Sequence, residues 1–397
     1  MKITDVKPLF VNTFLYVRVY TDEGLVGLGE SGAWGYQNAA AEVVSTFKEY
    51  LIGKDPLQIE HHWQYMYRAF HFRGAAIMGA ISAIDIALWD IAGKVYGVPV
   101  YRLLGGGCRN KARTYMQVSG TTTEELVENC IQAKKAGYTA VGHLNPFLDT
   151  PRKEPFFSTY ANMLDEAAER VAIIRDAVGN DVDLCLELHR RLKPAEAIAF
   201  AHKVERFTPM FLEDPIPPDN FDEMANVAAG IHIPIATGER IHTIQEYNML
   251  FSRNAMAYAR TCVCLCGGLS GVKKIAAMAE AKGIQIVPHN PLSPVSSAVC
   301  LQLAAAVENF AIMELPDHSM AATTERYSSS PSTPEEVKAF HTRDIATWSP
   351  QVKNGFASLP EAPGIGVALV EDAEKRFPYK RKALLTRLHI DGSIVDQ

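Results

Sequence analysis

Two kinds of hydrophobic pattern divide the chain near residue 105. Residues 15–20 alternate apolar with polar side chains, a turn-forming Thr-Asp-Glu-Gly follows, and an apolar stretch returns at 25–29, which is typical of a β-hairpin. Between 77 and 95, apolar residues recur at steps of three and four, which predicts a helix with one buried face. Gly97 and Pro99 would end that helix. The glycines at 105–107 form a candidate domain linker.

After residue 111, short apolar strands alternate with helices. Eight such strands are predicted, at 113–118, 139–144, 183–188, 209–213, 234–238, 258–262, 284–287 and 311–314. Thr122 with Glu125, and Thr243 with Glu246, form capping boxes that begin two of the intervening helices. Eight βα units at this spacing favour a closed (β/α) barrel over an open doubly wound sheet. Beyond about residue 320 the pattern is irregular, with one further strand predicted at 364–370.

Three acidic residues end consecutive predicted strands. A separation of 26 residues, about the length of one βα unit, lies between Glu187 and Glu213 and again between Glu213 and Glu239. Equal spacing would bring the three carboxylates together at the carboxyl ends of the strands, where the active sites of barrels lie. Because these charges would repel one another, a hard divalent cation with oxygen ligands is expected, and Mg²⁺ is the usual one.

Two histidines and a fourth acid extend this set. His189 lies two residues beyond Glu187, on the same side of an extended chain. His289 ends the predicted seventh strand, and Glu314 ends the eighth. A metal ion, imidazoles and a further carboxylate suit the removal of a proton next to a substrate carboxylate, because the cation stabilises the enediolate while a base takes the proton.

Composition restricts the class of protein. The chain has 397 residues, a formal net charge of −6 and a hydrophobic fraction of 48%, which is typical of a folded protein with a large core. The acidic excess argues against nucleic-acid binding, and no apolar run reaches the roughly 18 residues of a membrane span. The first residues lack the apolar core of a signal peptide. Seven cysteines, an odd number, fit reduced thiols, so a cytoplasmic enzyme is expected.

Over nearly its whole length the chain resembles the enolase superfamily, in its branch of mandelate racemase and muconate lactonizing enzyme. It is most similar there to the galactonate, gluconate and mannonate dehydratases. The motifs that carry the resemblance are YTDEG at 20–24, AIDIALWD at 83–90, LGG at 104–106, FLEDP at 211–215, TGER at 237–240, CGGL at 266–269 and PHNPL at 288–292.

The resemblance implies an α/β fold, a (β/α)7β TIM-like barrel with an α+β capping domain formed from both chain ends. The expected domains are an N-terminal α+β capping domain at 1–111, the catalytic barrel at 112–320, and a C-terminal segment at 321–397 that returns to the cap. The resemblance also implies a Mg²⁺ cofactor, a small sugar-acid substrate and a homo-oligomer. Its metal ligands fall on Glu187, Glu213 and Glu239.

Roles at the remaining positions also follow from the resemblance. His189 fits the third-strand acid of the Asp/Glu-x-His pattern of acid-sugar dehydratases, and His289 fits the seventh-strand base. The candidate substrate contacts are Glu314, Arg260, His143 and Trp34. Trp34 and its neighbour Tyr36 could line a lid over the barrel mouth, or could simply pack.

Three positions depart from the usual family pattern. The first ligand is Glu187 rather than Asp, and is one methylene longer. The second strand has Gly142 where many members carry Lys or Arg. The sixth strand has Cys262 where most members carry the Asp that orients the base, an Asp that the mannonate dehydratases also lack. His289 would then have no acidic partner to set its tautomer and pKa.

These features predict a Mg²⁺-dependent hydro-lyase that converts an aldonate to a 2-keto-3-deoxy sugar acid. His289 would take the proton from carbon 2, and His189 would protonate the departing 3-hydroxyl. One alternative is a racemase, epimerase or cycloisomerase that uses the same enolate. Another is a weakly active or non-catalytic homologue, which the Cys262 substitution would favour.

Two other patterns have competing interpretations. Residues 27–32 match the dinucleotide-binding GxGxxG pattern, but their place on the return strand of a hairpin argues against that function. Cys262, Cys264 and Cys266 alternate along the predicted sixth strand and would share one face. Buried small side chains are favoured there over a thiolate zinc site, which would need a second Cys or His pair.

Overall fold

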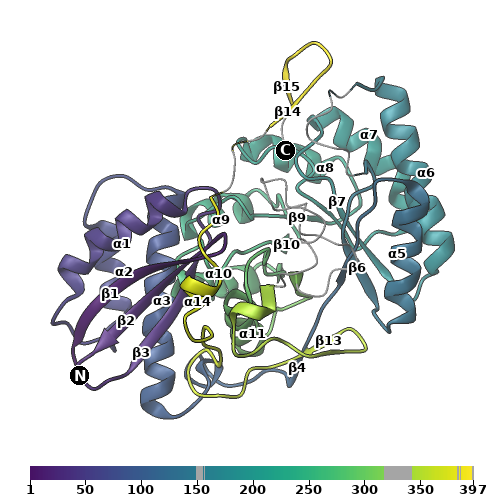
Figure 1. The fold of residues 1–397 in the computed structure, drawn as a ribbon. Coiled ribbons are helices and arrows are strands. Elements are labelled where there is room, and N and C mark those ends of the chain that lie inside the picture. Colours follow the sequence, from purple (N-terminus) through teal and green to yellow (C-terminus); the bar gives the residue numbers. More distant parts are fainter. Residues whose placement is uncertain (149–154, 156, 317–341, 382–383, 385, 396–397) are drawn as a thin grey trace.

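Two bodies lie side by side in the computed structural model, which describes residues 1–148, 155, 157–316, 342–381, 384 and 386–395. Figure 1 shows a smaller body, made of a three-stranded sheet and helices α1–α3, beside a larger α/β body. The expected domain boundary at 320/321 lies outside the described residues.

The first body begins with an antiparallel sheet in the order β1-β2-β3. Its strands are Ile3–Val11, Phe14–Thr21 and Val26–Ser31. Its helices are α1 (Gln37–Leu51), α2 (Ile59–Arg68), α3 (Ala75–Tyr96) and the short α4 (Val100–Leu103). The predicted hairpin, now β2 and β3, is therefore confirmed.

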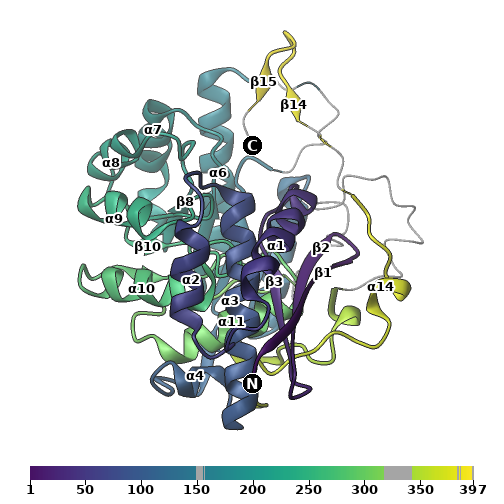
Figure 2. The ribbon, with the colours of Figure 1, turned by 90° about the vertical axis from the view of Figure 1, so that its left-hand side faces the viewer.

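Helix α3 is the centre of this body. It ends at Gly97, whose φ of 68° is left-handed, as the sequence predicts. Helix α3 is long and apolar enough to cross a membrane, contrary to the expectation from the sequence. However, 78% of its most apolar 18-residue stretch is buried inside the protein. Figure 2 shows α3 between the β1–β3 sheet and the second body, so its apolar surface is the core of a folded domain.

The glycines of the GxGxxG pattern allow β3 to approach α3. A Cβ atom on Gly27 would lie 2.0 Å from the carbonyl oxygen of Ala87, and one on Gly29 would lie 1.9 Å from that of Ala83. Close packing of a strand on a helix therefore accounts for these glycines. The strand itself belongs to an antiparallel sheet rather than to a βαβ unit, so nothing in this arrangement supports a dinucleotide site.

The second body is built on a parallel sheet of seven strands in the order β11-β10-β9-β8-β7-β6-β5. Its strands are β5 (Met116–Gln117), β6 (Ala140–Leu144), β7 (Asp183–Glu187), β8 (Phe211–Glu213), β9 (Ile235–Thr237), β10 (Tyr258–Ala259) and β11 (Gln285–Ile286). Its helices are α5 (Thr123–Lys135), α6 (Tyr160–Val178), α7 (Pro194–Val204), α8 (Phe221–Ala229), α9 (Ile244–Ser252), α10 (Gly268–Glu280) and α11 (Pro294–Ala306). A short 3-10 turn, η1 (Glu205–Phe207), follows α7.

The predicted eighth strand forms only isolated bridges among the described residues. Phe310 bridges Ile286 of β11 on one side, and Met313 bridges Thr114 on the other. The predicted sixth strand is also shorter than expected, because regular pairing in β10 stops at Ala259. The sheet and its helices are consistent with a TIM-like barrel.

The C-terminal segment returns to both bodies. Strand β13 (Phe356–Ser358) pairs with β12 (Val352–Lys353) and with β4 (Lys111–Arg113). The other short elements are η3 (Thr342–Ile345), α14 (Ala373–Arg376), β14 (Arg387–Leu388) and β15 (Ile394–Val395). Asn12 donates its backbone N–H to the carbonyl of Phe377, which joins this segment to the first sheet.

The strand predicted at 364–370 is wrong. Gly364 and Gly366 have φ values of 80° and 82°, which a regular strand does not allow. Gly364 bridges Pro99, and Leu369 bridges Ala346, so isolated bridges join this segment to its neighbours.

Buried polar contacts join the two bodies. Asp85 of α3 accepts the backbone N–H of Ser270 on α10 at 3.0 Å. Glu30, at the end of β3, is fully buried and accepts from the hydroxyl of Ser293 at 2.6 Å and the backbone N–H of Ser296 at 2.9 Å. Since these serines begin α11, the first body is fixed to the second next to the segment that carries His289.

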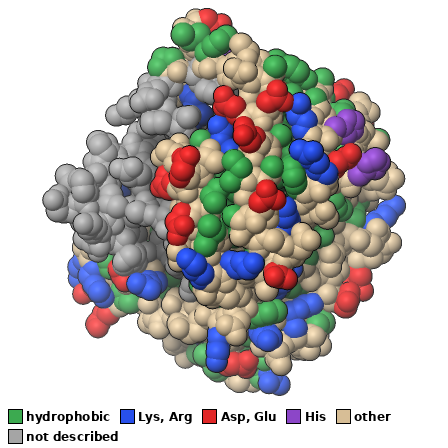
Figure 3. Space-filling model, turned by 90° about the vertical axis from the view of Figure 1, so that its right-hand side faces the viewer, with side chains coloured by type: hydrophobic (Ala, Val, Ile, Leu, Met, Phe, Trp, Pro, Cys, Tyr) green, Lys and Arg blue, Asp and Glu red, His purple; other side chains and the backbone are tan. Residues whose placement is uncertain are grey.

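The outer face on the side of α5 and α6 carries charges of both signs. Figure 3 shows lysine and arginine intermixed with aspartate and glutamate on this face, with small apolar areas between them. Neither sign gathers into a single patch among the described residues in that view.

We expect the variant Gly29→Ala to lower the free energy of unfolding by about 1–3 kcal/mol or more, because its Cβ would overlap the carbonyl of Ala83. Urea unfolding measures this change. Gly107→Ala is the matched control, since its nearest contact would be an ordinary 3.4 Å. Equal stability of the two variants would contradict the packing argument.

Burial raises the pKa of Asp85 to about 7. A carboxyl whose pKa is higher in the folded than in the unfolded chain costs stability as pH rises between the two values. We therefore expect the wild type to lose stability relative to Asp85→Asn between about pH 4 and 7, by up to about 1.4 kcal/mol per pH unit. Urea unfolding at several pH values measures the difference. The exposed Asp219→Asn is the control, and parallel pH profiles for wild type and Asp85→Asn would refute the assignment.

Candidate active site

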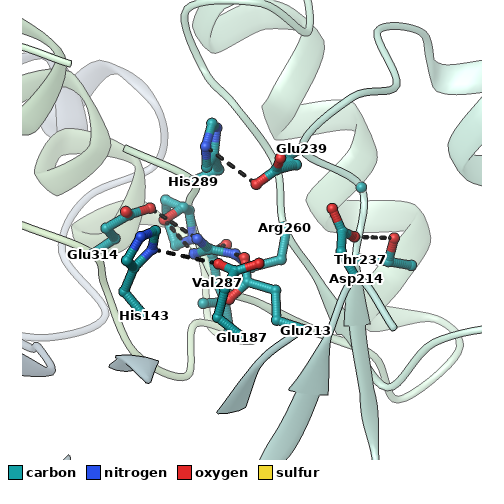
Figure 4. Close-up of polar contacts among 12 residues, drawn as sticks. His143, Glu187, Glu213, Asp214, Thr237, Glu239, Arg260, Val287, His289 and Glu314 are labelled. Carbon is teal, nitrogen blue, oxygen red and sulfur yellow. Dashed lines mark hydrogen bonds and ion pairs between the residues drawn. The ribbon is translucent and has the colours of Figure 1, made fainter. Parts of the chain in front are cut away.

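Acidic side chains gather at the carboxyl ends of the parallel strands. Glu187 ends β7 and Glu213 ends β8, and the two are partners in the register of these strands. Glu239 follows β9 by two residues, and its side chain is 11% exposed. Figure 4 shows the three carboxylates at one end of the sheet, as their spacing in the sequence predicts.

Two arginines lie among these acids. Arg260, directly after β10, forms a buried ion pair with Glu213. Arg190 forms an ion pair of 2.5 Å with Glu239 and one of 3.5 Å with Asp214. Sequence reasoning missed Arg190 and Asp214 as members of the site. Their positions in the sequence could have indicated them, because Arg190 directly follows His189 and Asp214 directly follows Glu213.

The pKa values of the acids reflect burial and charge. Burial, together with the charges of Glu239 and Asp214, holds the pKa of Glu187 well above its usual range. Burial likewise raises the pKa of Glu213, although Arg260 opposes that shift. Burial would also raise the pKa of Glu239, but His289 and Arg190 outweigh it and hold that pKa below the usual range. Among the ion pairs of the described residues, an arginine contacts Glu213 and Glu239, whereas His143 is the partner of Glu187.

His289 lies against Glu239 at the mouth. Its Nε2 atom is 3.3 Å from Oε2 of Glu239. Its Nδ1 atom is buried and has no hydrogen-bond partner among the described residues, consistent with Cys262 standing where an orienting acid was expected. Burial lowers the pKa of His289, which favours the neutral imidazole that a general base requires.

His143 and His189 form a second group of imidazoles. Their ring centroids are 6.0 Å apart, edge to face, and Nδ1 of His143 is 3.5 Å from Oε2 of Glu187. Burial, and after it the charge of Arg190, hold the pKa of His189 well below its usual range. The chain reaches this arrangement by turning, because β7 ends at Glu187 and His189 is not in the extended backbone predicted from the sequence.

Backbone strain is concentrated at these strand ends. His143, His189, Arg190 and Asp214 all have left-handed φ values, between 40° and 64°. Such conformations cost about 1–3 kcal/mol for a residue with a side chain, and they persist where the surroundings impose them. Their concentration next to the buried acids is typical of a functional site.

Gly142 leaves room for an aromatic ring on the second strand. A Cβ at this position would lie 2.4 Å from the ring of Tyr115. A lysine or arginine at position 142, which the family pattern of the sequence analysis would place there, would therefore require Tyr115 to move. The position of Tyr115 therefore explains why Gly142, and not a basic residue, fits at this point of the second strand.

Glu314 and Arg260 are held inside the protein. Glu314 accepts from Nε2 of Gln117 at 2.7 Å, from Nη2 of Arg260 at 2.8 Å and from the backbone N–H of Asn290 at 2.8 Å. Arg260 is 1% exposed. Direct contact of either residue with a substrate, as the sequence suggested, would require some of these bonds to break.

Trp34 lies in the loop between β3 and α1, half-buried against the core. Its neighbour Gly32 donates its backbone N–H to the carbonyl of Cys264 at 2.7 Å, so the loop is fixed to the turn that follows β10. Tyr36 is 66% exposed.

The three cysteines do not share one face of a strand. The backbone N–H groups of Leu265 and Cys266 both bond to the carbonyl of Cys262, so residues 262–266 form a turn. All three thiols are buried, and burial raises the pKa of each. All seven cysteines of the chain are free of disulfides.

The chemistry of the donor set fits a hard divalent cation. Oε1 of Glu187 is buried without a hydrogen-bond partner among the described residues, which is the kind of atom that a cation would satisfy. In the part of the chain that the structure describes, no three His, Cys, Asp or Glu side chains are close enough to form a metal cluster. Figure 4 shows Arg260 among these carboxylates, where it forms an ion pair with Glu213.

Two family models match the chain. The N-terminal domain of mandelate racemase / muconate lactonizing enzyme matches residues 6–105, and the enolase C-terminal domain-like family matches residues 125–373. The chain therefore belongs to the enolase superfamily, in the branch of mandelate racemase and muconate lactonizing enzyme.

Relatives within that branch are similar over their full length. The D-galactonate dehydratase of Verminephrobacter eiseniae is 35% identical over 100% of both chains, and that of Variovorax paradoxus is 36% identical over 96% of both. These relatives are hydro-lyases. The predictions of the family and of a hydro-lyase enzyme are confirmed.

Solved structures agree with the fold. A member of the enolase superfamily from Salmonella Typhimurium is 31% identical, with a TM-score of 0.83 over 95% of this chain and 98% of that one. An enolase from Agrobacterium radiobacter with bound sodium and L-malate is 26% identical, with a TM-score of 0.88 over 100% of both chains.

Proposed function

We propose that the protein is a Mg²⁺-dependent acid-sugar dehydratase that converts an aldonate of the galactonate, gluconate or mannonate type to a 2-keto-3-deoxy sugar acid. One observation carries this proposal: acids and imidazoles converge at the carboxyl ends of the parallel strands in a chain whose full-length relatives are named D-galactonate dehydratase.

Glu187, Glu213 and Glu239 would hold the cation. The unpartnered Oε1 of Glu187 and the mutual repulsion of the three carboxylates support this assignment. A divalent cation bound there would stabilise the negative charge that develops on the substrate carboxylate. His143 and Trp34 remain candidate substrate contacts. Glu314 would influence the substrate indirectly, through Arg260 and Asn290, to which it is hydrogen bonded.

His289 would take the proton from carbon 2. Its lowered pKa favours the neutral form, and Glu239 beside it would stabilise the imidazolium that results. His189 would give a proton to the 3-hydroxyl, which leaves as water while the electron pair of the C2–H bond forms the C2=C3 double bond. Tautomerisation of this enol gives the 2-keto acid. Burial and Arg190 oppose the charged form of His189, whereas Glu239 favours it.

We further propose domain boundaries at 111/112 and 320/321, with Phe310–Glu314 as the eighth strand that closes the barrel. The bridges of Phe310 to β11 and of Met313 to Thr114 support closure. A homo-oligomer in the cytoplasm, acting on a small molecule, completes the proposal, and the seven free thiols support a reducing compartment.

Incubation with a panel of aldonates and aldarates tests the activity. We expect Mg²⁺-dependent formation of a 2-keto acid from at least one aldonate, and at least a hundredfold loss after the metal is removed with EDTA. Restoring Mg²⁺ is the control. No product from any sugar acid would refute the dehydratase, and isomerisation without loss of water would identify the racemase or epimerase instead.

Separate variants test the two histidine roles. We expect His189→Asn to abolish dehydration but to retain exchange of the carbon-2 proton with deuterated solvent, because the base remains. His289→Asn should lose both, by about a hundredfold or more. Proton NMR in deuterated water measures the exchange, and His232→Asn, with its side chain 90% exposed, is the control. Retained exchange in His289→Asn would contradict the assignment of the base.

A further inference from the structure

Arg260 is an unusual occupant of the barrel interior. It is among the largest fully buried side chains of the described residues. Each of its three guanidinium nitrogens donates to a protein oxygen: Nε to Glu213, Nη2 to Glu314 at 2.8 Å, and Nη1 to the carbonyl of Pro288 at 3.1 Å. An arginine removed from water in this way is held by charge on several sides at once.

The guanidinium is fixed from the side opposite to Glu213. Glu314, its second partner, is itself anchored by Gln117 and by the backbone of Asn290. The carbonyl of Pro288 belongs to the segment that leads to His289. Arg260 therefore cannot leave Glu213 without breaking contacts to two other segments of the chain, at Pro288 and Glu314.

Glu213 is thus shared between two cations. It is one of three proposed metal ligands, and it is also the partner of Arg260. A divalent ion that binds Glu213 would lie within a few ångströms of a guanidinium that cannot withdraw. Two positive charges on one carboxylate repel each other strongly at low dielectric.

We propose that Arg260 is a positioning residue that sets the metal affinity of the site: its guanidinium holds Glu213 in place in the metal-free protein and weakens binding of the divalent cation by charge repulsion. This inference rests on the proposed function, because it assumes that Glu213 is a metal ligand. It assigns to Arg260 a role through Glu213 and not a contact with the substrate.

The distribution of charge supports this assignment. Four buried acids, Glu187, Glu213, Asp214 and Glu314, lie at this end of the sheet together with Glu239, which is 11% exposed. Arg260 bonds Glu213 and Glu314, whereas Arg190 bonds Glu239 and Asp214. Glu187 is the one that neither arginine contacts in an ion pair of the described residues. The cation would then bind at Glu187 and draw on carboxylates that the arginines already hold.

Binding of Mn²⁺, measured by electron paramagnetic resonance and calorimetry without substrate, tests the proposal. We expect Arg260→Gln to lower the Kd for Mn²⁺ at least tenfold, because glutamine removes the charge but can still hydrogen bond to Glu213. Arg260→Lys, which keeps the charge, should stay within threefold of the wild type. Arg175→Gln is the matched control, since Arg175 donates to the carbonyls of Gly179 and Val182 before the amino end of β7.

Circular dichroism and thermal unfolding establish that each variant is folded. If Arg260→Gln does not fold, the double variant Arg260→Gln/Glu314→Gln removes one charge of each sign, so the net buried charge of the cluster stays as in the wild type. It too should bind Mn²⁺ at least threefold more tightly than the wild type, because the lost guanidinium contacts Glu213 directly and the lost carboxylate does not.

The outcomes separate this inference from the proposed function. An unchanged or weaker affinity in the folded Arg260 variants, with Mn²⁺ bound by the wild type, would overturn the inference and leave the metal site intact. Failure of every protein to bind Mn²⁺ would overturn both. Binding by Arg260→Gln but not by the wild type would support both.

Discussion

Negative charge buried at the carboxyl ends of the parallel strands is the constraint on which the site depends. A buried carboxylate without a partner costs several kcal/mol, so four of them at one end of a sheet, with Glu239 beside them, require compensating charge. Arg260 and Arg190 supply part of it, and each joins acids from different strands. The same ion pairs that make the metal-free site stable also decide which carboxylate oxygens remain for a cation.

The capping body is fixed to the barrel beside this charged region. Glu30 binds the start of α11, and Gly32 binds the carbonyl of Cys264 in the turn after β10. Strand β3 can approach α3 closely because Gly27 and Gly29 have no side chain. These two glycines of the GxGxxG pattern therefore allow a strand to pack on a helix. As a result the loop that carries Trp34 is positioned by the barrel itself.

Regular spacing made much of this protein predictable. The 26-residue interval between Glu187, Glu213 and Glu239 reports the length of a βα unit, and the acids do lie at successive strand ends. Helix α3 and the first hairpin followed from local periodicity and turn residues. The strand at 364–370 failed, because a run of apolar residues does not reveal the positive φ of Gly364 and Gly366.

The sequence by itself indicated the family through its motifs. It also gave the order of the βα units and the acids at three successive strand ends, because hydrophobic periodicity and spacing are local properties of the chain. Only the tertiary structure decided the partners of those residues. Arg260 contacts Glu213 and Glu314, which are 47 and 54 positions away, and Tyr115 fills the space beside Gly142. Such contacts depend on how the strands are aligned and how the side chains fill the interior, and no local pattern encodes them.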